Sequence, residues 1–87
     1  MNFVKYDLGQ LSGGELATVE VRERANVLLM DQPNFMRYQR HQQFNHHGGQ
    51  ALRSPVQLRV PTAGHWYVVL DLGGGTGTIH SNMTLSR

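Results

Sequence analysis

The feature that most constrains the fold is the segment 65–72, HWYVVLDL, which is the longest apolar run of the 87-residue chain and contains its only Trp. Turn-forming residues precede it at 62–64 (TAG), and three glycines follow it. β-Branched and aromatic residues favour a strand. Alternation places Trp66, Val68 and Leu70 on one wholly apolar face and a mixed set of side chains on the other. The segment therefore predicts a central strand with one face in the core and the other partly covered.

Shorter segments repeat this alternation along the chain. Residues 17–22 (ATVEVR) alternate most clearly, as expected of a half-buried antiparallel strand, and residues 24–26 predict a hairpin connection to the next strand. About six or seven short strands joined by glycine turns predict an all-β fold, an antiparallel β-sandwich that is jelly-roll-like. The other predicted strands are residues 3–8, 26–31, 56–60 and 78–86. The predicted core comprises Val19, Val21, Leu29, Val56, Leu58, Trp66, Val68, Leu70 and Ile79.

One long loop, residues 33–53, interrupts the strand pattern. Residues 34–40 predict one or two turns of helix, with Asn34 as the cap and with Phe35 and Tyr38 on one face. A connection of roughly 20 residues is long beside the usual median of about 4–6, and such loops are usually functional or mobile. The aromatic residues of this loop predict that it is anchored to the sandwich.

Length and composition restrict the class of protein. The chain predicts a single domain over residues 1–87. It has no Cys, which excludes disulfides and thiolate metal sites and favours a reducing compartment. The first residues lack the charged start and apolar block of a secretion signal, and no apolar run approaches the roughly 20 residues of a membrane helix. These features predict a cytoplasmic protein.

Several motifs, in chain order, are those of one protein family. They are residues 6–9 (YDLG), 25–27, 29–31, 34–35 with Tyr38, 48–49, 54–55, Pro61, 64–69 (GHWYVV), 71–74 (DLGG) and Gly77. With these motifs the sequence resembles the small bacterial domain-of-unknown-function family 1883 over nearly its whole length, although residues 42–47 depart from the usual pattern. The resemblance implies a compact β domain, found alone or joined to a TIR domain, and it implies no activity and no catalytic residues.

Two groups of residues invite a ligand-binding interpretation, and each has a simpler one. Residues 73–77 (GGGTG) resemble a phosphate-binding loop, but a strand and not a helix is expected to follow, so a hairpin turn is predicted. His41, His46 and His47 lie close in sequence, but without Cys or a nearby carboxylate they fit no strong metal-site spacing. A solvated loop is the default interpretation, and a protonation-sensitive charge is the alternative. No nucleophile is accompanied by a convincing base, so neither metal, cofactor nor enzyme activity is predicted.

The distribution of charge points to a binding role. Residues 31–66 carry four arginines and one aspartate, a net charge of +3 in a chain whose total is +2. Arginine pairs with phosphate or carboxylate, and aromatic side chains stack on bases or fill protein pockets. His65 has two interpretations, as a groove residue or as a boundary histidine bonded to an adjacent turn. The predicted ligand-binding residues are Arg37, Tyr38, Arg40, Phe44, Arg53 and His65.

The function predicted from these features is a non-enzymatic binding module. The segment 35–59 would recognise a protein or an anionic ligand, with nucleic acid as a weaker possibility and a homo-oligomer as a further one. One alternative is a purely structural or oligomerisation domain, in which the loop covers a sheet and its aromatic residues face inward. The other is a small hydrolase-like enzyme whose site is not visible in the sequence.

Overall fold

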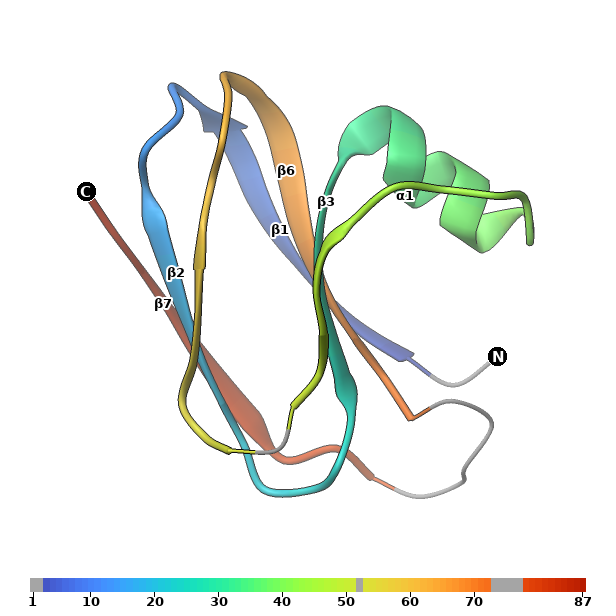
Figure 1. Ribbon diagram of the computed structural model, residues 1–87, viewed down its shortest axis with the longest axis vertical. Coiled ribbons are helices and arrows are strands. Elements are labelled where there is room, and N and C mark those ends of the chain that lie inside the picture. Colours follow the sequence, from blue (N-terminus) through green and yellow to red (C-terminus); the bar gives the residue numbers. More distant parts are fainter. Residues whose placement is uncertain (1–2, 52, 73–77) are drawn as a thin grey trace.

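The computed structural model describes residues 3–51, 53–72 and 78–87, and these form seven strands and one short helix (Figure 1). No helix in these ranges is long and apolar enough to cross a membrane. In chain order the elements are β1 (Phe3–Leu11), β2 (Leu16–Val21), β3 (Asn26–Asp31), α1 (Gln32–Gln39), β4 (His47–Gln50), β5 (Val56–Arg59), β6 (Gly64–Asp71) and β7 (Ser81–Ser86).

The strands form two antiparallel sheets, with the orders β1-β6-β3-β4 and β5-β2-β7. This confirms the predicted all-β architecture of two packed sheets. The predicted segment 65–72 is confirmed as a central strand, since β6 lies between β1 and β3. Among the described strands, only β3 and β4 are both consecutive and paired, and α1 separates them. At every other connection the chain passes from one sheet to the other.

Two predicted hairpins are therefore wrong. Residues 24–26 connect β2 to β3, but these strands belong to different sheets and do not pair. Residues 73–77 lie outside the described ranges, and the strands on either side of them, β6 and β7, also belong to different sheets. The physical reason is that each of these strands presents an apolar face to the core between the sheets. Two such strands joined by a short connection can bury these faces against each other across the sandwich instead of pairing side by side.

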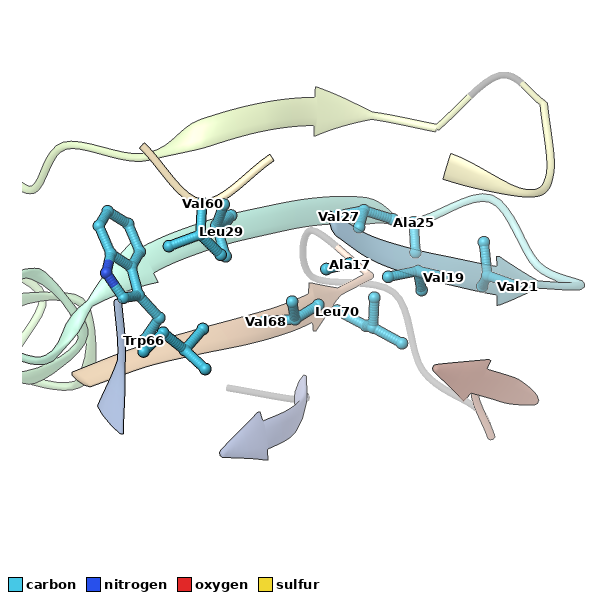
Figure 2. Packing of buried hydrophobic residues seen from close by; sticks show 11 residues of the cluster. Ala17, Val19, Val21, Ala25, Val27, Leu29, Val60, Trp66, Val68 and Leu70 are labelled. Carbon is cyan, nitrogen blue, oxygen red and sulfur yellow. The ribbon is translucent and has the colours of Figure 1, made fainter. Parts of the chain in front are cut away.

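The core lies between the two sheets (Figure 2). Trp66 is only 4% exposed, and its indole N–H donates to the backbone oxygen of Thr62 at 2.9 Å. Of the nine predicted core residues, six are buried, whereas Val56, Leu58 and Ile79 are partly buried and pack against the others. At one margin the sheets are joined by the hydroxyls of Tyr6 on β1 and Ser81 on β7, which lie 2.7 Å apart.

The helix α1 covers the outer face of the four-stranded sheet, where it packs on β3 and β6 (Figure 1). Phe35 stacks on Tyr67 with ring centroids 4.2 Å apart. The helix begins earlier than predicted, because its N-cap is Asp31 and not Asn34. An Asp31 carboxylate oxygen accepts the backbone N–H of Asn34 at 3.2 Å, and Pro33 suits the first turn because that turn needs no donor there.

Two further differences involve glycine. Gly9 does not end the first strand, because a bulge between Asp7 and Gly9 carries β1 on to Leu11. The edge strand β4 was predicted as loop, since its two glycines provide no alternation of side chains. The stretch 33–53 therefore holds most of a helix and an edge strand rather than one long loop.

Candidate functional site

Two chain connections and the segment that enters β7 meet at one end of the sandwich, because in an antiparallel fold every second connection returns to the same end. The connections β2–β3 and β4–β5 cross the lower end in Figure 1, and the chain enters β7 beside them. Backbone hydrogen bonds tie these segments together: the N–H of Arg22 donates to the oxygen of His80 at 3.1 Å, and that of Ala51 to Ala25 at 2.9 Å. We call this region the loop end, and it consists of residues 20–26, 50–51, 53–54, 71–72 and 80–82.

Besides a cleft of about 160 Å³ that Arg24 and Asp71 line, the loop end contains two adjoining clefts. The first has a volume of about 180 Å³, and we call it the arginine cleft; its charged lining residues are Arg22, Glu23, Arg24 and Arg53. The second is larger, about 410 Å³, and we call it the large cleft; its polar lining residues are Glu20, Arg22, Ser54, His80, Ser81 and Asn82. Arg22 and Ser54 line both, so the clefts adjoin each other.

The arginine cleft carries an excess of positive charge. Its one carboxylate, Glu23, is bound by His80: one oxygen accepts the backbone N–H at 2.6 Å, and the other lies 2.8 Å from Nδ1. The backbone hydrogen bond from His80, and then the bond from its side chain, hold the pKa of Glu23 below its usual value, so this residue remains ionised. The two ion pairs of the described residues are His65–Asp7 and His80–Glu23, so none of the three arginines has a carboxylate partner there.

The walls of the large cleft are held by two serine hydroxyls. Ser54 Oγ accepts the backbone N–H of Val21 at 3.0 Å, which fixes the β4–β5 connection to the end of β2. The hydroxyl of Ser81 is bonded to that of Tyr6. Glu20 and Asn82 lie directly opposite each other on β2 and β7, and both are exposed.

The structure separates the predicted ligand-binding residues. Arg37 and Arg40 are exposed on α1 and at its C-cap, on the outer side of the four-stranded sheet, whereas Arg53 lies at the loop end. Tyr38 is only 5% exposed and donates its hydroxyl to the Asp71 carboxylate, so it is not available for stacking on a partner. Phe44 packs edge-on against Tyr38, with centroids 5.2 Å apart. These two aromatic side chains help to cover the sheet.

His65 lies at the start of β6, at the opposite end of that strand from Asp71. Its Nε2 is 2.6 Å from a carboxylate oxygen of Asp7, and its ring stacks on Tyr67 with centroids 5.0 Å apart. The backbone N–H of Gly9, and then His65, hold the pKa of Asp7 below its usual value. His65 therefore secures the bulge of β1 and does not join Arg53.

Comparison with known families gives one match. The family described as "Domain of unknown function (DUF1883)" matches residues 1–87. The chain belongs to the DUF1883 family. This confirms the resemblance identified from the sequence motifs. No curated protein and no solved structure matches the chain significantly.

Two residues at the loop end of this DUF1883 domain were missed by the sequence analysis, namely Arg22 and Arg24. Both lie within residues 1–30, where four carboxylates outnumber three basic side chains. The signal that could have found them is the alternation of antiparallel connections. The connections after the second and fourth strands meet at one end, which brings Arg22 and Arg24 to Arg53. Arg53 is placed at that end only if β4 is counted as a strand, and this segment was predicted as loop.

The histidines of the DUF1883 domain are dispersed. The ring of His46 lies 5.5 Å from that of Phe44, and the ring of His47 lies 6.0 Å from that of Trp66. The described residues include no group of three or more side chains that could hold a metal ion. The chemistry offered by the described clefts is therefore hydrogen bonding and charge, centred on arginine.

Proposed function

We propose that this DUF1883 domain is a non-enzymatic binding module that holds a phosphate- or carboxylate-bearing ligand in the arginine cleft. The observation that carries the proposal is that Arg22, Arg24 and Arg53 come together without a carboxylate partner among the described residues, while Glu23 is held by His80. A guanidinium group donates two parallel hydrogen bonds to a phosphate or carboxylate. A cleft of about 180 Å³ is below the usual range for small-molecule sites and suits an anionic group rather than a whole metabolite.

This proposal relocates the binding surface predicted over residues 35–59. Its aromatic part, around α1, packs on the sheet, which favours a structural role for that part. Arg53 alone of the three predicted arginines lines the cleft. The proposed binding surface therefore includes Arg22 and Arg24 and excludes the residues around α1.

Binding without catalysis is proposed because histidine and hydroxyl groups are not coupled. His65 and His80 are bonded to Asp7 and Glu23, and within the described residues neither histidine is bonded to a serine or threonine hydroxyl. Activation of such a nucleophile depends on that hydrogen bond.

The test is a phosphate titration followed by NMR, with wild-type protein and the variant Arg22→Gln/Arg24→Gln/Arg53→Gln. Each charge-assisted hydrogen bond is worth about 1.5–3 kcal/mol, so loss of the cluster should weaken phosphate binding at least about tenfold. Wild-type affinity should also fall as NaCl is added, because exposed charges are screened.

A matched control is Arg37→Gln/Arg40→Gln, which removes exposed arginines from the α1 side. Its phosphate affinity should stay within about twofold of wild type, because these arginines line neither cleft and exposed charges are screened by salt. Retention of full phosphate binding by the loop-end variant would contradict the proposal. So would a loss confined to the α1-side variant, which would restore the surface first predicted.

A further inference from the structure

We infer that the ligand of the arginine cleft is a sugar phosphate, whose hydroxylated ring lies in the large cleft. This inference rests on the proposed function and extends it from an anionic group to a class of molecule. The two clefts share Arg22 and Ser54, so a phosphate bound at the arginines leaves the rest of its molecule beside the large cleft. The large cleft has a volume of about 410 Å³, which lies within the range of about 300–1,000 Å³ typical of small-molecule sites.

The side chains of Glu20 and Asn82 suit a pair of neighbouring hydroxyl groups. They are direct cross-strand partners on β2 and β7 and line the same cleft. Side chains of such pairs lie close, with Cβ atoms about 4.5–5.5 Å apart. An ionised carboxylate only accepts hydrogen bonds, whereas an amide both donates and accepts. Two adjacent hydroxyls of a sugar ring can donate to Glu20 and exchange hydrogen bonds with Asn82.

These two side chains are also unengaged. Within the described residues, neither Glu20 nor Asn82 makes a side-chain hydrogen bond, and Glu20 forms no ion pair. By contrast, the hydroxyls of Ser54 and Ser81 are bonded to Val21 and Tyr6 and serve as fixed walls. A ligand therefore meets one carboxylate and one amide whose hydrogen-bonding capacity is turned toward solvent.

A nucleotide fits this site less well than a simple sugar phosphate. Nucleobases are commonly held by stacking on aromatic side chains. The lining of the large cleft includes no Phe, Tyr or Trp among the described residues, and its one ring is the imidazole of His80. That ring is already bonded to Glu23.

The test compares ribose 5-phosphate, inorganic phosphate, ribose and adenosine monophosphate as ligands of the full chain, by NMR titration. Ribose 5-phosphate should bind at least about fivefold more tightly than inorganic phosphate, because one additional hydrogen bond contributes a factor on that order. The variant Glu20→Gln/Asn82→Ala should lose this preference while it still binds inorganic phosphate. The control Thr18→Ala/Thr84→Ala changes another cross-strand pair of β2 and β7, outside the cleft lining, and should keep the preference.

The possible results distinguish a failure of the sugar-phosphate inference from a failure of the proposed anion site. Equal affinities of the wild type for ribose 5-phosphate and phosphate would overturn the sugar-phosphate inference and leave the anion site standing. No binding of either ligand would contradict the anion site and the inference together. Adenosine monophosphate binding more than about tenfold tighter than ribose 5-phosphate would overturn the assignment, because a difference of about 1.4 kcal/mol would then come from the base.

Discussion

Gly48 allows the edge strand β4 to lie close against β3. Its φ is +92°, and a Cβ atom there would overlap the backbone oxygen of Val27 and come within 3.3 Å of Leu58. Gly48→Ala should destabilise the protein by about 1–3 kcal/mol, since a strained backbone and a close approach both oppose the new methyl group. Urea denaturation measures this change as a lower midpoint at an unchanged slope.

Gly49→Ala is the matched control on the same strand. An added Cβ at Gly49 meets nothing within 4 Å, and its φ is not in the positive range. Its effect should stay within about 0.5 kcal/mol, as for ordinary surface substitutions. Equal losses in the two variants would show that the backbone strain at Gly48 is not the cause.

Glu15 is the one charged residue that is buried within the described ranges, at 3% exposure. Its carboxylate accepts from the N–H of Ser12 at 2.9 Å and from that of Gly13 at 2.8 Å, and so closes the β1–β2 turn. The backbone hydrogen bond from Ser12 is the main cause that holds the pKa of Glu15 below its ordinary value of 4.5. A lowered pKa in the folded state gives stability that is complete above that value and is lost as the pH falls through the folded-state pKa.

Glu15→Gln should therefore lower the thermal midpoint at pH 7 and reduce the fall in midpoint on acidification below about pH 4.5. Asp7 and Glu23 also have lowered pKa values, so the dependence is reduced and not abolished. The control is Glu20→Gln, because Glu20 is exposed and its side chain makes no hydrogen bond within the described residues. If the thermal midpoint of Glu15→Gln falls with decreasing pH as steeply as that of wild type, ionisation of Glu15 does not stabilise the β1–β2 turn.

Among the elements, α1 is fastened to the sheet by aromatic packing and by polar contacts that include the hydrogen bond from Tyr38 to Asp71. Burial is the main cause that raises the pKa of the Tyr38 phenol, and the Asp71 carboxylate raises it further, so the hydroxyl stays a donor at all ordinary pH values. Tyr38→Phe keeps the ring and removes the bond. It should cost about 0.5–1.5 kcal/mol and speed amide hydrogen exchange in α1 more than in β6.

Met36→Ala provides the comparison for this helix, since Met36 is 44% exposed and is not part of the aromatic cluster. Its exchange rates should match those of wild type. If Tyr38→Phe exchanges in α1 as slowly as wild type, the helix is held by packing alone.

Some helices and strands could be predicted from the sequence, and others could not. β6 was predictable because a central strand carries side chains on both faces, and its alternation of apolar and mixed residues is visible. β4 was not, because Gly48 and Gly49 present no side chains to alternate. The predicted N-cap of α1 was three residues too late, because Asp31 and Asn34 are both good cap residues.

The candidate site could not be predicted in full, because β4 was predicted as loop. Arg53 was predicted from charge, but its partners Arg22 and Arg24 are distant in sequence, and only the count of antiparallel connections brings them together. Tyr38 and Phe44 were predicted to face a ligand because an aromatic residue in a loop has the same sequence pattern whether it points out or in. The structure places both against the sheet.

At the scale of the whole molecule, the passage of the chain from sheet to sheet has a kinetic consequence. Partners are far apart along the chain: β1 pairs with β6, and β2 with β7. Proteins dominated by such pairings fold on the order of milliseconds to seconds, because long loops must close before contacts are gained. During synthesis on the ribosome, β2 has no partner on one side until β7 has emerged. The exposed margin of β2 is then the place where a growing chain is most open to pairing with its neighbours.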